Sequence, residues 1–256
     1  GDTTEPAVVK EFSRIGVTPV QISLGRAHGL ALTGSGAIYS WGNGKYGRLG
    51  HGNIVSLQYP ALLPRSQMMD YKFVQAGEAF STAITVKGNV ESWGLNDYMQ
   101  LGIPSAALDI KPMETSPAGV QQIPMQEEFV KTACGDRFAM GLTENGTIYE
   151  WGRQTITRLV IQTDYESGVA FVDEKMTDYT ITNIAAGKTF AAAIADCGAL
   201  FLWGGYSQTL ITGGKSFYRS PLIYAEKDDF VFPKVVNVAC GTDHAVAMFI
   251  DEDLDH

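Results

Sequence analysis

The chain has 256 residues, of which 45% are hydrophobic and 18% charged, a composition typical of a folded globular protein rather than a disordered one. Its net charge of −9 argues against nucleic acid as a partner, because binding a phosphate backbone requires clustered Lys and Arg. No run of 18 apolar residues occurs, so we expect no membrane span, and a protein is the expected partner.

The cysteine and glycine content indicates the cellular compartment and the type of secondary structure. The three cysteines, Cys134, Cys197 and Cys240, are odd in number and form no C-x-x-C pair, which favours a reducing compartment over a disulfide scaffold. Glycine contributes 28 residues, and a glycine-rich chain favours short strands joined by turns. We therefore expect an intracellular protein built from strands.

An internal repeat organises the chain. Five segments align on an anchor glycine, and the anchors are Gly25, Gly77, Gly135, Gly187 and Gly241. A second glycine follows the first four anchors at offset +11, and a Trp-Gly pair follows at offset +16. The pattern predicts four full repeats and a partial fifth, near 20–71, 72–129, 130–181, 182–235 and 236–250. We treat 1–256 as a single domain or as a fragment of one.

Each repeat shows the same order of predicted elements. A strand such as PVQISLG leads into the anchor, and small residues at +4 and +6 with a large apolar residue at +7 predict a second strand. The glycine at +11 predicts a tight turn into a third strand that ends in Trp-Gly. A less regular strand follows the loop after Trp, as in YPALLP, and residues 66–72 could form one helical turn. Three or four strands in about 52 residues indicate a propeller blade.

The stretches LGRAHGLALTGSGAIYSWGNGKYGRLGHG in repeat one and ACGDRFAMGLTENGTIYEWG in repeat three resemble the repeats of the regulator of chromosome condensation family. This resemblance covers roughly residues 17–250. It implies an all-β fold, a β-propeller of the regulator-of-chromosome-condensation type, usually of seven blades. Four and a half repeats do not close such a ring. Either the chain is part of a longer one, or the propeller is open, small or completed by another chain.

The chain departs from the family pattern in two further ways. The family's Gln-Leu-Gly after Trp is matched by 48–50 (RLG) and 100–102 (QLG), but the aligned residues 158–160 (RLV) and 210–212 (LIT) do not match it. A basic tail suited to chromatin is also missing. We therefore expect the cytoplasm rather than the nucleus.

Residues 42–47 (GNGKYG) satisfy G-x-G-x-x-G, the pattern of a dinucleotide-binding loop. Such a loop opens a helix, whereas Pro60 and Pro64 flank a short apolar run here. In repeat two, Asn96 replaces Gly44, which predicts a positive-φ turn at this position, since Gly and Asn both tolerate one. We interpret the stretch as the exit loop of a blade.

The sequence carries no arrangement typical of an active site. His28 and His244 lie at +3, where the other repeats have Phe, which indicates packing positions rather than metal ligands. Cys134 and Cys240 lie at −1 with small residues in the other repeats, and no nucleophilic triad is apparent. We expect neither an enzyme nor a cofactor.

The repeat geometry predicts one functional face. The strand after the anchor runs away to the turn at +11, and the next strand returns, so the anchor turn and the exit loop lie at the same end of each blade. The candidate partner-binding residues of this face are Arg26, Lys45, Tyr46, Arg48, Glu78, Asp97, Tyr98, Asp136, Arg137, Arg153, Lys188 and Tyr206. Tyr and Arg are common anchors of protein interfaces.

Two functions remain open from the sequence. The first is a non-enzymatic interaction or scaffold module that presents the propeller-face loops to a protein partner, which could be one subunit of a larger assembly. The alternative is guanine-nucleotide exchange on a small GTPase, a role that the resemblance implies. The family can engage such a GTPase through an inserted β-wedge. The longest inter-anchor segment, with its extra residues in 103–128, is a second candidate functional loop, although its residues match no wedge.

Overall fold

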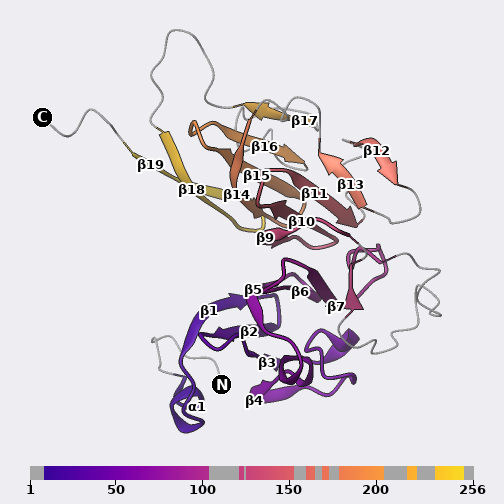
Figure 1. The fold of residues 1–256 in the computed structure, drawn as a ribbon, viewed down its shortest axis with the longest axis vertical. Coiled ribbons are helices and arrows are strands. Elements are labelled where there is room, and N and C mark those ends of the chain that lie inside the picture. The colour runs from indigo at the N-terminus through magenta and orange to yellow at the C-terminus, as the bar shows by residue number, and fades with distance from the viewer. Residues whose placement is uncertain are drawn as a thin grey trace, which may run out of the picture.

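The computed structural model describes residues 9–103, 121–123, 125–152, 160–164, 169–172, 179–204, 218–223 and 234–250. These residues form five antiparallel sheets, which we call blades 1 to 5 in chain order. In Figure 1 blade 1 lies at the bottom, and the blades follow one another to β18 and β19 at the upper left. The prediction of an all-β chain is confirmed.

The first three blades contain these strands. Blade 1 comprises β1 (Pro19–Leu24), β2 (His28–Thr33), β3 (Ile38–Gly42) and β4 (Leu57–Leu62). Blade 2 comprises β5 (Tyr71–Ala76), β6 (Phe80–Thr85), β7 (Val90–Gly94) and β8 (Gln121–Gln122). Blade 3 comprises β9 (Phe129–Cys134), β10 (Phe138–Thr143), β11 (Ile148–Gly152), β12 (Val160–Asp164) and β13 (Val169–Val172).

The last two blades differ in the number of strands described. Blade 4 comprises β14 (Ile181–Ala186), β15 (Phe190–Ala195), β16 (Leu200–Gly204) and β17 (Tyr218–Ile223). Blade 5 comprises β18 (Lys234–Cys240) and β19 (Ala245–Ile250). The first strand of each of blades 2 to 5 packs on the blade before it.

In the described ranges, three short helical segments accompany the strands. The 3₁₀ turns are η1 (Lys45–Gly47) and η2 (Pro64–Gln67). The helical turn considered for residues 66–72 is therefore found slightly earlier, where Pro64 begins it. Helix α1 (Lys10–Arg14) was not expected, because five residues carry too little periodicity. Its buried Phe12 packs edge-to-face on Trp41 of blade 1. Among the described residues, no helix has the length and apolar character that crossing a membrane requires.

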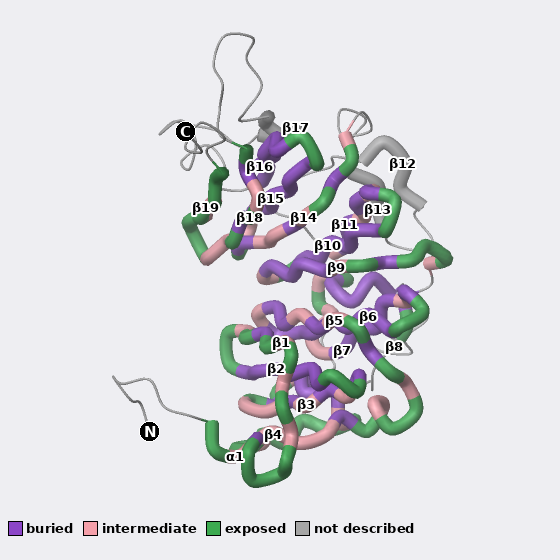
Figure 2. The backbone as a smooth tube through the Cα atoms, turned by 60° about the vertical axis from the view of Figure 1, so that its left-hand side comes forward, coloured by how far each residue is buried: buried purple, intermediate pink, exposed green. Residues whose placement is uncertain are grey.

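Strand register repeats from blade to blade. The residue at +4 lies opposite the Trp of the third strand in blades 1 to 4, as Gly29 opposite Trp41 and Ala191 opposite Trp203. The small residue is required because the indole packs on it: a Cβ added to Gly29 would lie 2.4 Å from the Trp41 ring. The residues at +5 and +7 point between blades, so that Leu30 and Leu32 form one cluster with Val74 of blade 2. The core therefore lies between successive sheets, and Figure 2 shows the central strands of blades 1 to 4 as largely buried.

Indole N–H groups join neighbouring blades. Trp93 Nε1 donates to the carbonyl oxygen of Arg48 at 2.9 Å, and Trp151 Nε1 donates to that of Gln100 at 3.1 Å. Arg48 and Gln100 each lie seven residues after the Trp of the preceding blade. A backbone carbonyl in the exit loop of one blade thus accepts the hydrogen bond of the buried indole N–H in the next blade.

The third junction uses a different acceptor. Trp203 Nε1 donates to carboxyl Oε2 of Glu150 on β11 at 3.3 Å. Burial raises the pKa of Glu150 to about 8, so this carboxyl is mostly protonated at neutral pH. The residue equivalent to Arg48 and Gln100 is Arg158, which lies outside the described residues.

Candidate partner-binding face

The face is built on the anchor turns. In each blade the N–H of the anchor glycine donates to the carbonyl of the residue at +3, as Gly77 donates to Phe80 at 2.9 Å. The +3 ring folds back over the glycine, and a Cβ on Gly77 would lie 2.5 Å from the Phe80 ring. A glycine is needed at the anchor because of this close approach. The residue at +1 then lies at the wall of a cavity shared by neighbouring blades.

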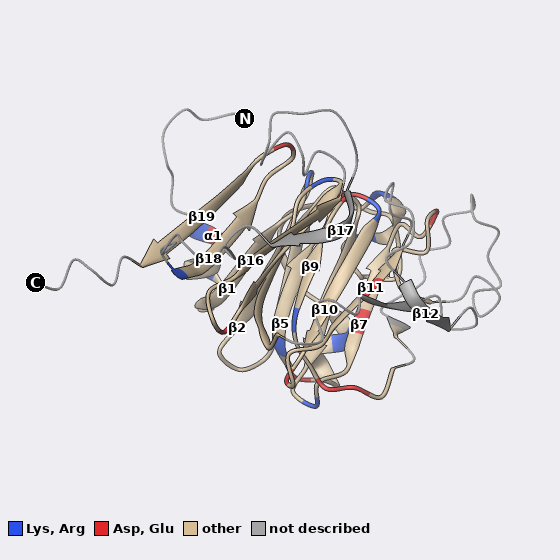
Figure 3. Cartoon of the chain, turned by 90° about the horizontal axis from the view of Figure 1, so that it is seen from above, with Lys and Arg blue, Asp and Glu red and all other residues tan. Residues whose placement is uncertain are grey.

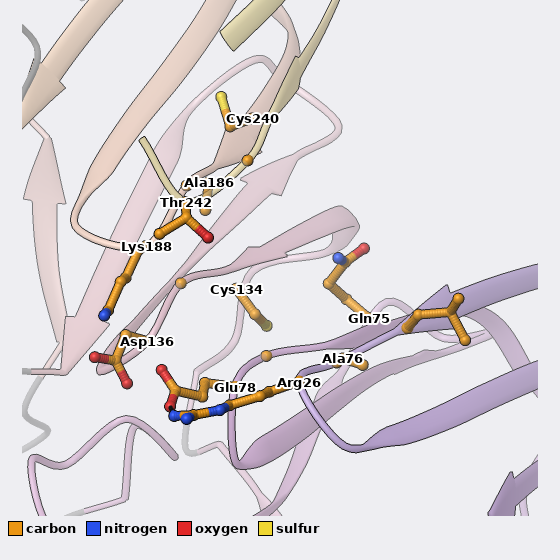
Figure 4. Close-up of a pocket in the computed structure, with 16 residues that line it drawn as sticks. Arg26, Gln75, Ala76, Glu78, Cys134, Asp136, Ala186, Lys188, Cys240 and Thr242 are labelled. Atoms are coloured by element: carbon orange, nitrogen blue, oxygen red, sulfur yellow. Dashed lines mark hydrogen bonds and ion pairs between the residues drawn. The ribbon is translucent and has the colours of Figure 1, made fainter. Parts of the chain in front are cut away.

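The +1 residues of neighbouring blades surround an axial cavity of about 480 Å³. They are Arg26, Glu78, Asp136, Lys188 and Thr242, from blades 1 to 5. Figure 4 shows Glu78, Asp136 and Lys188 grouped at one side of this cavity, with the Arg26 side chain reaching Glu78. The rest of the wall consists of the residues at −1 and the anchor glycines, together with Gln75.

The charged side chains of this cavity interact with one another and shift each other's pKa values. Arg26 forms an ion pair with Glu78, the next blade's residue. Burial, and then the hydrogen bond to Glu78 and its charge, raise the pKa of Asp136 to about 6. The hydrogen bond from Asp136, and then the Arg26 guanidinium, lower the pKa of Glu78. The two carboxyls titrate as a pair, and the charges of Arg26 and Lys188 act on them as well.

The exit loops lie at the same end of the blades as the anchor turns. Asn43 N–H donates to the Ala27 carbonyl at 2.8 Å, and Leu95 N–H donates to the Ala79 carbonyl at 3.0 Å. The predicted arrangement of the two loops is confirmed by these bonds. Figure 3 shows the strands mostly uncharged, with acidic and basic residues largely at their ends.

Each of the first two exit loops presents a tyrosine next to a cation. The Tyr46 ring has the Lys45 ammonium at 4.8 Å and the Arg48 guanidinium at 5.4 Å from its centroid. The Tyr98 ring has the Arg137 guanidinium of the next blade at 4.2 Å. These distances are in the range of cation–π contacts, which hold the rings in fixed orientations.

Two residues of these loops are bound within the fold. Arg48 is buried, and its guanidinium donates to the carbonyls of Lys45 at 2.9 Å and Glu78 at 3.4 Å. Arg48 therefore ties blade 1 to blade 2 beneath the surface. Asp97 accepts a hydrogen bond from the Gln100 side chain at 2.9 Å, within its own loop.

The conformation of the G-x-G-x-x-G stretch differs from one expectation. No helix follows it, as predicted, and Gly47 is succeeded by a loop. The positive-φ turn predicted at Gly44 is wrong, because Gly44 has φ −85°. The residues of this stretch with positive φ are Gly42, Tyr46 and Gly47, with φ 101°, 65° and 72°. Gly44 is instead required by packing, since a Cβ there would lie 2.0 Å from the Val55 carbonyl oxygen.

A buried histidine supports the face from beneath. His28 Nε2 is 2.9 Å from Ser81 Oγ, which itself donates to the Arg48 carbonyl at 3.0 Å. Burial, and then the charge of Arg48, lower the pKa of His28 to about 4, so the ring is neutral at physiological pH. The expected packing role of His28 is confirmed, whereas His244 at the same offset in blade 5 is exposed.

The predicted site residues fall into three groups. Arg26, Glu78, Asp136 and Lys188 come together at the cavity, while Lys45, Tyr46, Arg48, Asp97, Tyr98 and Arg137 belong to the exit loops and the turn beside them. Arg153 and Tyr206 lie outside the described residues, as does most of the 103–128 segment. Sequence reasoning missed Gln75 and Thr242 as cavity residues, although Thr242 shares offset +1 with the others and could have been found by it.

All three cysteines are free thiols. Cys134 and Cys240 line the cavity wall as free thiols, and burial raises the pKa of each to about 12. Cys197 is an exposed thiol in the hairpin turn between β15 and β16. Within the described parts of the chain, no three His, Cys, Asp or Glu side chains are grouped to hold a metal ion.

Comparison with known proteins assigns the repeats. Two family models, both described as regulator of chromosome condensation (RCC1) repeat, match residues 35–84 and 87–142 and residues 20–48. The chain is 28% identical to human E3 ubiquitin-protein ligase HERC2 over 99% of its own length, but covers 5% of that protein. It is 25% identical to the yeast guanine nucleotide exchange factor SRM1 over 95% of its length, covering 50% of that protein. The crystal structure of human WBSCR16 matches 92% of the chain at a TM-score of 0.76 and 22% identity, and the chain covers 58% of it.

Proposed function

Because this chain is built from repeats of the regulator of chromosome condensation family and folds as a β-propeller of that type, we propose that it is a protein-interaction module. The surface that binds the partner is the face formed by the anchor turns and exit loops. This role requires no acid, base or nucleophile. It uses the scaffold to hold polar and aromatic side chains in fixed positions.

The observation that supports the proposal most directly is the convergence of four charged residues on one cavity. Arg26, Glu78, Asp136 and Lys188 come from four separate blades, and their repeat offset brings them to one point. Around them, the tyrosine rings of blades 1 and 2 are each held by an adjacent cation. Pre-positioned Tyr and Arg side chains lose little conformational entropy on binding, which is why they often dominate interface energetics.

Affinity capture with matched variants tests the proposed face. The variant Tyr46→Ala/Tyr98→Ala removes the two rings, and Lys87→Ala/Glu144→Ala removes exposed side chains from the hairpin turns at the opposite end of the blades. Partners recovered with wild type and quantified by mass spectrometry should be lost with the first variant and kept with the second. Equal recovery with all three proteins would show that this face is not the binding surface.

A second candidate function is guanine-nucleotide exchange on a small GTPase. It is favoured by the similarity to SRM1, whose name gives that activity. The match covers 95% of this chain and 50% of SRM1. Exchange works through binding energy, since the factor stabilises the nucleotide-free GTPase. The same charged cavity would serve as the contact surface.

A nucleotide-release assay separates the two functions. A panel of small GTPases loaded with a fluorescent guanine nucleotide is mixed with the chain, and release is followed in an excess of unlabelled nucleotide. Exchange activity predicts acceleration with one member, and Glu78→Ala/Asp136→Ala should abolish it. No acceleration with any GTPase would eliminate the exchange function and leave the interaction module intact.

A further inference from the structure

Arg48 is a buried cation without a counter-ion. The residue is 6% exposed, and no Asp or Glu carboxylate of the described chain lies within 4 Å of its guanidinium. The nearby Glu78 carboxylate forms its ion pair with Arg26 instead. Burying a charge that is not paired is costly, so Arg48 is expected to have a role that compensates for this cost.

The fold does not require this positive charge. The backbone carbonyl of Arg48 accepts the indole N–H of Trp93, and that of Gln100 accepts the indole N–H of Trp151 in the same way. Gln100 occupies the equivalent position of repeat two, and its neutral side chain forms its hydrogen bonds inside its own loop. A neutral residue therefore meets the structural need at this position, and the charge of Arg48 is an addition to it.

One terminal nitrogen of this guanidinium is available to a ligand. Nε and Nη1 of Arg48 donate to backbone carbonyls, whereas Nη2 donates to no acceptor in the described chain. In that part of the chain, the fully buried side-chain nitrogen and oxygen atoms without a partner are His28 Nδ1 and Thr189 Oγ1. Nη2 is not one of them, so it reaches solvent although the rest of Arg48 is buried. A ligand would meet a donor that the fold already holds in place.

Two more cations lie near this point. The Lys45 ammonium and the Arg48 guanidinium lie 4.8 Å and 5.4 Å from the centroid of the same ring, that of Tyr46. Burial, and then the charge of Arg26, lower the pKa of Arg48, which places Arg26 within electrostatic range. The Arg26 side chain is 75% exposed and reaches Glu78 (Figure 4). Exposed ion pairs are weak, so Arg26 remains available to a stronger anion.

The charges of this group of residues match a dianion. The group, which we call the Arg48 cluster, contains three cations and one carboxylate: Arg26, Lys45, Arg48 and Glu78. Two positive charges remain, although the whole chain carries −9. The carboxyl beside Glu78, Asp136, has a cation of its own, since Arg137 lies 3.8 Å away. A phosphorylated serine or threonine carries a charge of about −1.5 to −2 at pH 7, whereas Asp or Glu carries a single negative charge. The Arg48 cluster therefore favours a phosphate over a carboxylate.

We propose that the Arg48 cluster binds a phosphorylated serine or threonine of the protein partner. This inference rests on the proposed function, because the cluster lies on the proposed partner-binding face. The phosphate accepts a hydrogen bond from Nη2 of Arg48, and Lys45 and Arg26 supply the remaining charge. Ile54 and Val55 of the same exit loop are 55% and 62% exposed, and they offer apolar contacts to the partner residues beside the phosphate.

Bead-bound peptide libraries provide the probe. Three libraries share random flanking residues and differ at one fixed position, which is phosphoserine, serine or glutamate. The wild-type chain should be retained at least about fivefold more on the phosphoserine library than on the other two, because only that library carries a dianion. Equal retention on the phosphoserine and glutamate libraries, or no retention on any library, would overturn the proposal.

Arg48→Gln is the test variant, because repeat two has Gln at this position. It should lower retention on the phosphoserine library at least about fivefold, since the fixed donor is lost. The control Lys87→Gln removes an exposed cation at the opposite end of the blades and should stay within about twofold of wild type, because distant exposed charges are screened. Near-ultraviolet circular dichroism checks that both variants are folded. Undiminished retention of a folded Arg48→Gln chain would contradict the site.

Nuclear magnetic resonance gives a measurement that needs no variant. The Nε–H signal of Arg48 in the wild-type chain should shift when the best-retained phosphoserine peptide is added. The corresponding signal of Arg65, which is paired with the buried Glu91, should stay in place. A peptide that shifts Arg65 and leaves Arg48 unchanged would show that the phosphate binds elsewhere.

Phosphatase treatment separates this proposal from the proposed function. Affinity capture is repeated after the extract has been treated with phosphatase, and the partners that depend on Tyr46 and Tyr98 should then be lost. If these partners are kept, the phosphate site is wrong and the interaction module stands. If no partner depends on the two tyrosines, the interaction module fails, whereas retention on the phosphoserine library is measured without any partner.

Discussion

His28 offers a quantitative test of how the anchor turn is assembled. The residue is 5% exposed, its Nε2 lies 2.9 Å from Ser81 Oγ, and its Nδ1 has no hydrogen-bond partner. Blades 2 to 4 place phenylalanine at the same offset, folded over the anchor glycine in the same way. The substitution His28→Phe therefore introduces a ring that the turn already accommodates elsewhere in the chain.

The effect of this substitution depends on pH. Burial lowers the pKa of His28 from 6.5 to about 4, so between these values the unfolded chain takes up a proton that the folded chain does not. Stability is thus fully present above pH 6.5 and is lost as the pH falls toward 4. A shift of about 2.5 pKa units corresponds to about 3 kcal/mol of unfolding free energy at pH 4. At pH 7 the variant should lie within about 1 kcal/mol of wild type, because only one hydrogen bond is lost.

Urea unfolding at pH 7 and pH 4 measures the difference. Wild type should lose about 3 kcal/mol more than His28→Phe between the two pH values, since other titrating groups are common to both proteins. His244→Phe, at the same offset but exposed, serves as the control. An equal loss in wild type and His28→Phe would refute the assignment of His28 as a neutral buried ring.

Three further predictions concern other parts of the fold. Gly135→Ala places a Cβ 2.2 Å from the Phe138 ring and should lower the free energy of unfolding by about 3 kcal/mol. Gly52→Ala, which has open space around it but a positive φ, should lower that free energy by about 1 kcal/mol. Urea titration measures both values. Arg65 pairs with the buried carboxylate of Glu91 at 2.9 Å, so Arg65→Met should destabilise by about 3 kcal/mol, and adding Glu91→Leu should recover part of that loss in a double-mutant cycle. A cycle without coupling would contradict the pairing. The pKa of Asp136 is raised to about 6, so the folded chain binds a proton that the unfolded chain has released, and the free energy of unfolding falls as the pH rises from 4 to 6. Asp136→Asn should weaken this pH dependence, which melting curves at several pH values measure. Melting temperatures that change equally with pH in both proteins would contradict the prediction.

The repeat offsets account for most of what the sequence could predict. Small residues at +4 and the Trp at +16 predicted a hairpin, and the observed register places Gly29 opposite Trp41. The same offsets predicted that Arg26, Glu78, Asp136 and Lys188 lie at one end of the blades. Their position is confirmed, because all four line the same cavity. Their role in binding stays a prediction.

Features that do not repeat were not predictable in this way. The cluster of Glu91 with Arg65 and Tyr71 joins three segments at different offsets, and only the folded chain brings them together. The glycine at position 44 was assigned a backbone role because it alternates with Asn in the next repeat, whereas its actual constraint is the Val55 carbonyl pressed against it. Such contacts depend on three-dimensional distance and leave no periodic trace in the sequence.

The indole-to-carbonyl bonds between blades bear on how such a chain can change during evolution. Each buried Trp depends on an acceptor from the blade before it, so deleting or moving one repeat leaves an unsatisfied N–H in the next. At the junction of blades 3 and 4 the acceptor among the described residues is the Glu150 side chain, on the third strand of blade 3. A buried tryptophan and the group that accepts its N–H therefore belong to different repeats. The unit that is inherited intact is then the junction, which comprises the end of one repeat and the tryptophan of the next.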